Sequence, residues 1–443
     1  MRVAVLGGAG YVGLVTGAGL AALGHTVACA DVNEAKVSLL STGRSPIVEE
    51  GMEPLLAAQL AAGRLTFTTD AAGAIAGAGV VLIAVGTPPA PDGQSDLSQV
   101  VAVTRQIAQH LTPYAVVVLK STVPVGTVDL VREILGERHR EGEDFDIASN
   151  PEFLREGKGL ADFFNPDRIV TGAATERPLA VLRELYAPLL AGEAPGQRAP
   201  APLVETSIAT AQMIKYAANA YLATRISFIN ELAWVCERTG ADVEELAHGL
   251  GLDPRIGSSY LHPGLGFGGP CLDKDLRALV HVAESHGFQP GLLRAVLERN
   301  EGQLEEVASR LRAGLGGLLY NRVIGALGLA FKACTNDVRD SMAMRLVDRL
   351  EREGATVRAH DPEAMDAARA EAPGRTYVDD PYAAAEGAHA IAVLTEWPLY
   401  QALDLTRLRQ RMAGDLVVDT RNVLNPAAVR AAGLTYVGIG RGA

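Results

Sequence analysis

The chain is poor in cysteine and has no long apolar segment without charge. Its four cysteines are scattered along 443 residues, without the spacing of a metal site or the density of a disulfide framework. This pattern is typical of reduced thiols, so we expect a cytoplasmic protein. No stretch approaches the roughly 18 apolar residues of a membrane span, and the first residues read as a strand and not as a signal peptide. Neither a membrane nor a bound metal is expected.

Positive charge is outnumbered by negative charge. The chain has 40 lysines and arginines against 52 aspartates and glutamates, which gives a net charge of −12. This balance argues against nucleic acid and acidic membranes as partners, and it still allows a local basic pocket for a phosphorylated ligand. The length exceeds what one hydrophobic core supports and indicates two or three domains.

The N-terminal segment has the pattern of a nucleotide-binding sheet. An apolar run at 3–6 is followed by a glycine turn, by an alanine-rich helical stretch that closes at Gly24, and by a strand at 26–30. A strand, turn, helix and strand within about 30 residues are typical of a doubly wound parallel sheet. Helical patterns separate the further buried strands, which are predicted at 80–85, 115–119 and 146–148.

A helical middle precedes a second α/β pattern. Segment 187–203 is rich in proline, alanine and glycine and reads as a connector. Segment 206–237 has neither proline nor glycine and predicts a helix of roughly 45 Å, which would link two domains, form a dimer interface or lie in a core. The second α/β pattern predicts a helix at 341–353 and strands at 323–327, 356–359, 390–394 and 416–419.

The predicted fold class is therefore α/β, with two Rossmann-like doubly wound domains joined by a long central helix and a helical middle domain. The expected boundaries are 1–200 for the first domain, 201–315 for the helical domain and 316–443 for the last domain. The second α/β pattern lacks a glycine fingerprint comparable to that of the first, so the two are not a sequence repeat.

The first glycine turn fits a dinucleotide fingerprint. Its residues are Gly8, Ala9, Gly10, Tyr11, Val12 and Gly13, between the strand and the helix that the motif requires. Glycines let the backbone approach a pyrophosphate, and the helix N-terminus donates N–H groups to it. Asp31 ends the second strand 18 residues after Gly13, where a carboxylate binds ribose hydroxyls and repels a 2′-phosphate. NAD is therefore favoured over NADP.

A second spacing, Gly7-x-x-Gly10-x-x-Gly13, resembles the turn of nucleotide-sugar epimerases and short-chain reductases. Those enzymes relay a proton through a Tyr-x-x-x-Lys pair. None of the eleven tyrosines is followed four residues later by lysine, so that alternative lacks its catalytic pair.

Polar side chains follow three of the predicted strands. Thr87 lies in the segment 85–89, Thr122 in the segment 120–126, and Glu152 and Glu156 in the segment 149–157. The carboxyl ends of parallel strands open on one crevice, where the cofactor of a doubly wound sheet binds. Each segment alone would also fit an ordinary exit from a strand, and the three together favour a site.

Segment 266–275 reads Gly-Phe-Gly-Gly-Pro-Cys-Leu-Asp-Lys-Asp. Cys271 follows a glycine-rich bend, with Lys274 three residues on and Asp275 four residues on. A nearby ammonium favours the thiolate, which attacks carbonyls, and the aspartate could accept a proton or hold the lysine. By itself the segment fits a nucleophile and a small structural cysteine about equally.

Other cations could assist such a reaction. Lys215 and Asn219 are four residues apart on the predicted long helix and share one face. An ammonium and an amide can stabilise an oxyanion, although a solvated lysine and a buried asparagine fit the helix pattern better when it is taken alone. Lys332 and Arg339 follow the strand at 323–327 and could bind phosphate or ribose. The alternative is that they are solvated, as most lysines and arginines in loops are.

Together and in this order, these motifs resemble the nucleotide-sugar 6-dehydrogenases of the UDP-glucose/GDP-mannose dehydrogenase family. The likeness covers nearly the whole chain and is carried by six segments: 10–14, 120–126, 149–157, 215–220, 266–275 and 331–341. It implies oxidation of a primary alcohol to a carboxylate with two NAD⁺ in succession, through a Cys271 thiohemiacetal and thioester. Segment 166–170 (Pro-Asp-Arg-Ile-Val) resembles the UDP-glucose branch, which implies UDP-glucose as substrate and UDP-glucuronate as product.

The resemblance also assigns roles by position. Cys271 would be the nucleophile, Lys215 and Asn219 would stabilise the oxyanion, and Thr122, Glu156 and Asp275 would handle protons and the hydrolytic water. Residues implied to face NAD are Gly8, Gly10, Tyr11, Val12, Gly13, Asp31, Lys36, Thr87, Thr122, Glu156, Lys274 and Arg339. Residues implied to hold the nucleotide sugar are Glu152, Phe153, Leu154, Arg155, Lys215, Asn219, Tyr260, Leu261, His262, Pro263, Gly264, Gly268, Lys332 and Arg421.

Two features depart from the family pattern. Gly7-Gly8 adds one residue before the fingerprint, and Pro270 stands before Cys271, where it removes an N–H donor and restricts Gly269. The alternatives are a GDP-mannose 6-dehydrogenase, an N-acetylmannosamine-type dehydrogenase, which tends to lack the Lys-Asp after the cysteine, and a non-catalytic nucleotide-sugar binding protein. The family also implies a homodimer or a higher homo-oligomer.

Overall fold

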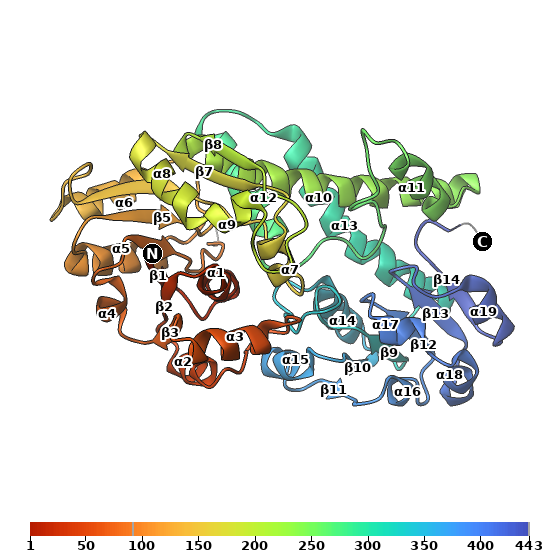
Figure 1. Ribbon diagram of the computed structural model, residues 1–443. Coiled ribbons are helices and arrows are strands. Elements are labelled where there is room, and N and C mark those ends of the chain that lie inside the picture. Colours follow the sequence, from red (N-terminus) through yellow and green to blue (C-terminus); the bar gives the residue numbers. More distant parts are fainter. Residues whose placement is uncertain (91–92, 442–443) are drawn as a thin grey trace. The chain divides into compact units, whose positions relative to one another are not determined.

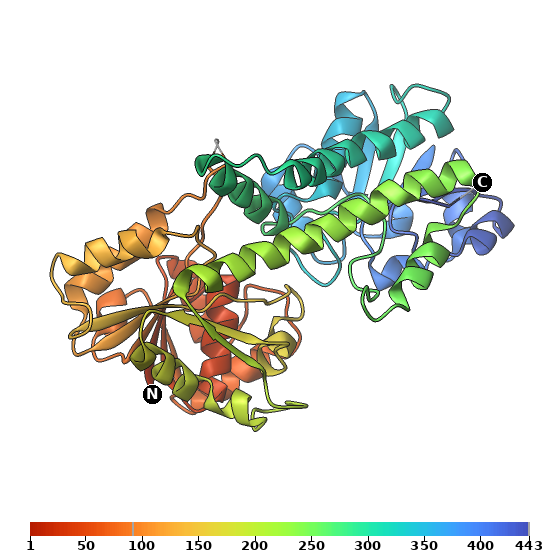
Figure 2. The same ribbon diagram turned by 90° about the horizontal axis from the view of Figure 1, so that it is seen from above.

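The computed structural model describes residues 1–90 and 93–441. The chain divides into two compact units. The first comprises 1–218 with 281–286, and the second comprises 219–280 with 287–443. The boundary at 218 falls inside the longest described helix, α10 (Ile208–Thr239), which is continuous over 32 residues (Figure 2).

The first unit is built on an eight-stranded sheet in the order β3-β2-β1-β4-β5-β6-β7-β8 (Figure 1). Neighbouring strands are parallel except for β6 and β7, which pair antiparallel. The strands are β1 (Arg2–Leu6), β2 (Thr26–Ala30), β3 (Leu65–Thr68), β4 (Val80–Ile83), β5 (Ala115–Leu119), β6 (Phe145–Ser149), β7 (Ile169–Ala173) and β8 (Leu203–Thr206).

Helices cover both faces of this sheet, because alternate strand residues point to opposite sides. Val116 and Val118 of β5 pack in the cluster that contains side chains of α1, α3 and α8. Val117 and Leu119 pack in the cluster that contains side chains of α4, α5 and α6. The helices are α1 (Tyr11–Ala22), α2 (Glu34–Ser41), α3 (Met52–Ala61), α4 (Ala71–Ile75), α5 (Ser98–His110), α6 (Thr127–Gly136), α7 (Gly159–Phe164), α8 (Glu176–Leu185) and α9 (Ala187–Ala191).

The second unit contains a six-stranded parallel sheet in the order β11-β10-β9-β12-β13-β14 (Figure 1). Its strands are β9 (Val323–Leu327), β10 (Thr356–His360), β11 (Thr376–Tyr377), β12 (Ala390–Val393), β13 (Leu416–Asp419) and β14 (Thr435–Val437). The helices that follow its strands are α14 (Met342–Arg352), α15 (Met365–Glu371), α16 (Pro381–Ala384), α17 (Pro398–Gln401), α18 (Leu405–Arg411) and α19 (Pro426–Ala431).

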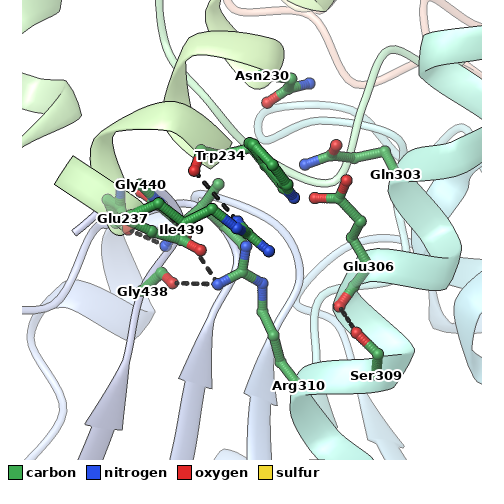
Figure 3. Close-up of polar contacts among 12 residues, drawn as sticks. Asn230, Trp234, Glu237, Gln303, Glu306, Ser309, Arg310, Gly438, Ile439 and Gly440 are labelled. Carbon is green, nitrogen blue, oxygen red and sulfur yellow. Dashed lines mark hydrogen bonds and ion pairs between the residues drawn. The ribbon is translucent and has the colours of Figure 1, made fainter. Parts of the chain in front are cut away.

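The helical middle consists of α10, α11 (Val243–Gly251), α12 (Leu272–Ser285) and α13 (Gly291–Gly314). In the second unit the segment 438–440 packs on α10. The amide of Gly440 donates to Oε1 of Glu237 at 2.6 Å, and Arg310 of α13 binds the same carboxylate and the Gly438 carbonyl (Figure 3). These contacts tie the last described residues to the helices of the unit.

The predicted fold class is confirmed: the first unit holds a mainly parallel Rossmann-like sheet and the second a parallel one, and a long helix and a helical region accompany them. The nine strands predicted from the sequence are all present, and the predicted long helix is shifted by only two residues, ending before Gly240 with its φ of +77°. Five strands were not predicted: β3, β7, β8, β11 and β14. The three-part domain division stays a prediction. Within the described residues no helix has the length and apolarity to span a membrane.

Candidate active site

The glycine turn after β1 leaves the start of α1 open. Gly7 has φ +85° and accepts a hydrogen bond from the amide of Gly10. A Cβ at Gly8 would lie 2.5 Å from Cβ of Cys29, and a Cβ at Gly13 would overlap the Gly7 carbonyl oxygen. No side chain caps α1 at Gly10, so the N–H groups of its first turn face outward with the positive end of the helix dipole. This arrangement fits a pyrophosphate.

Asp31 stands at the end of β2, beside this turn. Its Oδ2 accepts a hydrogen bond from the amide of Ala9 at 3.0 Å, and its Oδ1 accepts one from the amide of Asn33 at 3.0 Å. The carboxylate remains partly exposed, as binding of ribose hydroxyls requires. Lys36 is exposed on α2. Val32, 96 % exposed, was not predicted; it offers an apolar surface that a planar base could cover.

The ends of β4 and β5 are joined by side chains. The hydroxyl of Thr87 donates to the carbonyl of Thr122 at 2.8 Å, and the hydroxyl of Ser121 donates to the carbonyl of Val85 at 2.6 Å. The structure therefore brings Thr87 and Thr122 together, as the shared edge of a parallel sheet predicts.

Glu152 and Lys215 form a buried ion pair within the first unit. Nζ of Lys215 lies 2.9 Å from Oε1 of Glu152, and both side chains are less than 10 % exposed. The other carboxylate oxygen accepts the amide of Leu154 at 2.6 Å. Burial by itself raises the pKa of Glu152, but the charge and hydrogen bond of Lys215 outweigh it and the pKa is lowered. Nζ of Lys215 also lies 5.5 Å from the centre of the Phe153 ring.

The loop after β6 is held by ionic contacts. Arg155 binds both carboxylate oxygens of Asp162 through its side chain, at 3.0 and 2.5 Å. The hydroxyl of Tyr11 lies 2.6 Å from Oε2 of Glu49 and 3.0 Å from the carbonyl of Arg155. Burial and Glu49 raise the pKa of Tyr11. Tyr11 therefore links the fingerprint helix to the loop that carries Glu156, which is half-buried.

A second buried lysine lies in this unit and was given no role from the sequence. Nζ of Lys120 donates to Oδ1 of Asn150 at 3.0 Å, and the hydroxyl of Tyr186 donates to the same oxygen at 2.6 Å. Burial, together with the charge of Lys215 and against that of Glu152, lowers the pKa of Lys120 to about 8. A lysine at the end of a buried strand is the sequence signal for this group.

In the second unit, Cys271 stands at the start of α12. The residue is exposed, and its carbonyl accepts the amide of Asp275 at 3.0 Å. The thiol therefore lies at a helix N-terminus, where an anion is stabilised. Asp275 is 1 % exposed and binds Nδ2 of Asn219 at 2.6 Å through one oxygen and Nζ of Lys274 at 2.6 Å through the other. Four predicted residues thus gather around the first turn of α12.

The loop before Cys271 fits closely against the rest of its unit. A Cβ at Gly268 would lie 2.7 Å from the carbonyl oxygen of Asp340, and one at Gly269, which has φ +84°, would lie 2.6 Å from the ring of Phe331. Tyr260 has φ +62°, and a Cβ at Gly264 would lie 3.1 Å from Nη1 of Arg421. Of the residues between them, Leu261 and Pro263 are buried and His262 is exposed.

The predicted cations of this unit are held in different ways. Arg421 donates through Nε to the carbonyl of Leu394 at 2.9 Å. Arg339 pairs with both oxygens of Asp337, with Nε at 3.0 and 2.9 Å. Nζ of Lys332 lies 5.4 Å from the centre of the Phe331 ring. The structure places Arg421 beside Gly264 in the same chain, and it places Arg339 and Lys332 in the loop that carries Phe331.

Comparison with known proteins adds three matches to family models in chain order. They are the NAD binding domain of the UDP-glucose/GDP-mannose dehydrogenase family over residues 1–190, its central domain over 209–302 and its UDP binding domain over 325–426. The chain is 44 % identical over 444 residues to the UDP-glucose 6-dehydrogenase of Rhizobium meliloti, with all of both chains covered.

Solved structures agree with this assignment. A UDP-glucose dehydrogenase from the archaeon Pyrobaculum islandicum is 41 % identical with a TM-score of 0.90, covering 99 % of this chain and 97 % of that one. A UDP-D-ManNAc dehydrogenase from Pyrococcus horikoshii is 28 % identical with a TM-score of 0.87 over all of both chains. With the open glycine turn and Asp31, these matches lead to one conclusion. The chain belongs to the UDP-glucose/GDP-mannose dehydrogenase family and is an NAD-dependent dehydrogenase.

Proposed function

We propose that the chain is a UDP-glucose 6-dehydrogenase, which oxidises the C6 alcohol of the sugar to the carboxylate of UDP-glucuronate. The observation that carries the proposal is the exposed thiol of Cys271 at the first turn of α12, next to the linked side chains of Asn219, Lys274 and Asp275. Curated relatives at 42 to 44 % identity are UDP-glucose 6-dehydrogenases, which supports the choice of substrate.

The chemistry needs two oxidations at one carbon. Bound NAD⁺ supplies a hydride acceptor for each of them. The first oxidation removes a hydride and a proton from the alcohol and leaves an aldehyde. The thiolate of Cys271 then adds to the aldehyde carbon, and the carbonyl oxygen takes a proton to give a thiohemiacetal. Because the carbon stays bonded to the protein, the reactive aldehyde is not released between the two steps.

The second oxidation removes a hydride and a proton from the thiohemiacetal and leaves a thioester on Cys271. Water then attacks the acyl carbon, the C–S bond breaks, and the electron pair returns to sulfur as the thiolate. In total one alcohol, one water and two NAD⁺ give one carboxylate, two NADH and three protons. The thiol is regenerated unchanged, so it acts as a covalent catalyst.

The remaining residues stabilise charge and move protons in this proposal. Lys215 and Asn219 donate hydrogen bonds to the oxygen that becomes negative when the thiolate or water adds. Lys215 is an ammonium whose Nζ donates to Oε1 of Glu152 at 2.9 Å. Asp275 orients the amide of Asn219 through its 2.6 Å hydrogen bond. Thr122, Glu156 and Asp275 are the groups proposed to transfer protons and hold the hydrolytic water.

Cys271→Ser tests covalent catalysis. The variant should form no UDP-glucuronate above one part in a thousand of the native rate, because serine is a weak nucleophile without a base that activates it. NAD⁺ should still bind with its native dissociation constant, since the glycine turn and Asp31 are unchanged. Product formation is followed by chromatography and NADH by absorbance. Production of UDP-glucuronate by the variant at a near-native rate would refute the thioester.

The substrate is tested separately from the mechanism. The enzyme should form NADH with UDP-glucose at least a hundredfold faster than with GDP-mannose or with UDP-N-acetylmannosamine, each offered with NAD⁺. Faster turnover of GDP-mannose would assign the chain to the other branch of the family. Calorimetric binding of UDP-glucose without any NADH would instead indicate a non-catalytic binding protein.

We also propose that the protein forms a homodimer or a larger homo-oligomer. In the second unit α10 exposes Tyr221, Phe228 and Val235 by 60, 51 and 42 %. These residues are seven positions apart and share one face of the helix, and an exposed apolar face is typical of interfaces. Light scattering should give a mass of at least twice the 46.5 kDa of one chain. A mass of one chain at micromolar concentration would refute this.

A further inference from the structure

Three buried amide side chains hold the loop that leads to Cys271. Asn230 of α10 and Asn300 and Gln303 of α13 are only 2, 3 and 1 % exposed. They face the segment 264–269, which has no regular secondary structure. We call these three residues the amide clamp. Figure 3 shows Asn230 on α10 near Gln303 on α13.

Asn300 binds both backbone groups of one loop residue. Its Oδ1 accepts the amide of Phe267 at 2.8 Å, and its Nδ2 donates to the carbonyl of Phe267 at 2.9 Å. The other two amides share Gly264 in the same way. Oδ1 of Asn230 accepts the amide of Gly264 at 2.8 Å, and Nε2 of Gln303 donates to its carbonyl at 2.7 Å.

Arg299 sets the orientation of Gln303. Its Nη2 donates to Oε1 of Gln303 at 2.7 Å and to the carbonyl of Asn230 at 3.1 Å, while its Nη1 lies 2.9 Å from Glu306. With the oxygen of the Gln303 amide occupied by Arg299, the nitrogen is directed to Gly264. Figure 3 shows Gln303 and Glu306 close together on α13. A chain of polar contacts therefore runs from Glu306 through Arg299 and Gln303 to the loop.

The loop depends on these contacts because its backbone is buried without a strand or helix to pair with. Buried N–H and C=O groups need partners, and here side chains supply them. There is no space for a side chain at position 266, because a Cβ at Gly266 would lie 2.5 Å from Oδ1 of Asn300. The glycines of the loop and the amide clamp thus form one fitted arrangement.

We propose that Asn300, together with Asn230 and Gln303, is a positioning residue for Cys271. It acts through the segment 264–269, which ends two residues before the thiol, and not through contact with the substrate. The inference rests on the proposed function, in which Cys271 is the nucleophile. A thiol at the start of α12 attacks the aldehyde only when the preceding loop keeps it at the helix N-terminus.

Asn300→Leu removes both hydrogen bonds and keeps the number of side-chain heavy atoms and their branching. We expect kcat to fall at least tenfold, while the dissociation constant for NAD⁺ stays within twofold because the first unit is untouched. The rate of alkylation of Cys271 by iodoacetamide should fall at least threefold relative to that of Cys334, the other exposed cysteine. Peptide mass spectrometry resolves the two sites. If the leucine variant does not fold, two other variants are measured in the same way. Asn300→Asp removes the donor to the Phe267 carbonyl, and Gln303→Met removes the donor to Gly264 together with the acceptor of Arg299.

Ser227→Ala is the matched control. The hydroxyl of Ser227 on α10 donates to the carbonyl of Val296 on α13 at 3.0 Å and is buried. It links the same two helices without contact to the loop. We expect a lower melting temperature with kcat and the alkylation ratio unchanged. The proposal is overturned if the folded Asn300 or Gln303 variants keep kcat within twofold of native and the native alkylation ratio. The alkylation ratio needs no turnover, so it remains informative even if Cys271→Ser shows that the thioester is wrong.

Discussion

The two sheets begin with the same strand-helix-strand order, but the aspartate that follows the second strand is partly exposed in the first sheet and buried in the second. β1, α1 and β2 in the first unit have the same order as β9, α14 and β10 in the second, and an aspartate follows the second strand of each, Asp31 and Asp361. Asp31 is partly exposed and accepts two backbone amides. Asp361 is 2 % exposed and accepts four backbone amides and the indole N–H of Trp397. One carboxylate can bind a ribose, and the other is fully used by its own chain.

The first turns of the two helices differ in the same sense. α1 begins at Gly10 without a side-chain cap. α14 begins after Ser341, whose hydroxyl accepts the amide of Met344 at 3.4 Å and donates to the carbonyl of Leu329 at 2.6 Å. The anion site at the start of α1 is open, and the equivalent place in the second unit is occupied by the protein itself. The same strand-helix-strand pattern therefore serves cofactor binding in one unit and cohesion in the other.

The ends of the next strands extend the comparison. Lys120 follows β5 and donates its amide to the last carbonyl of β4, that of Ile83. Thr420 follows β13 and donates its amide to the last carbonyl of β12, that of Val393. The hydroxyl of Thr420 donates to the same carbonyl at 2.8 Å, and the residue is fully buried. A neutral group closes the second sheet at a position where the first sheet holds a buried cation.

The largest expected effect is that of Asp361→Ala. Five donors would lose their acceptor in the core, which should cost about 4 kcal/mol of unfolding free energy. Thermal and urea unfolding measure this loss, and NAD⁺ binding to the folded variant should remain native. A loss of stability no greater than that of Asp31→Ala would show that the two aspartates do not differ as described.

The next effect depends on pH. Because the pKa of Lys120 is lowered to about 8 from its ordinary 10.5, the unfolded chain binds more protons than the folded chain between these values. Stability therefore rises with pH across this window, by about 3 kcal/mol for this group. Lys120→Met should abolish the rise, seen as the difference between native and variant urea midpoints from pH 7.5 to 10.5. Exposed Lys158 gives the control, since Lys158→Met should leave the rise intact.

The smallest effect on the fold is expected for Asp31→Ala, whose main effect is on the cofactor. Loss of hydrogen bonds to a charged acceptor should weaken NAD⁺ binding about 30-fold, or about 2 kcal/mol. The melting temperature without cofactor should change little. Because the repulsion of a 2′-phosphate is also removed, the ratio of NADP⁺ to NAD⁺ affinity should rise. Fluorescence titration of both cofactors measures it, and an unchanged ratio would argue against a ribose contact at Asp31.

The strands missed by sequence reasoning have a common cause. β3 and β8 are the edges of the first sheet, and β11 and β14 are the edges of the second. Edge strands are short and half-exposed, so they lack the continuous apolar run that predicted β5 and β13. The fifth, β7, is fully buried and antiparallel to β6, but its sequence Ile-Val-Thr-Gly-Ala has only two apolar residues before a threonine and a glycine, so it lacks a continuous apolar run.

The parts of the site that consist of residues close together in the sequence could be predicted. The glycine turn, Asp31 and the segment around Cys271 are local patterns, and the structure places them at a helix start, a strand end and a helix start. The amide clamp was not predictable, because Asn300 and Phe267 are 33 positions apart and an asparagine in a helix has no local sign of its partner. The pairing of Lys215 with Glu152 spans 63 positions and was missed for the same reason.

The close approach of Gly8 to Cys29 has a consequence for how cofactor preference can evolve. Position 29 lies inside the sheet, where the Cys29 backbone and Cβ pack on Gly8 of the phosphate turn and its Sγ faces Gly17 of α1, so a larger side chain would push against α1. Position 31, two residues later, is partly exposed, so a substitution there requires no repacking of the core. Selection for another dinucleotide can therefore change position 31 while the buried residues of the sheet stay the same. Cofactor preference can then evolve without a change in the fold.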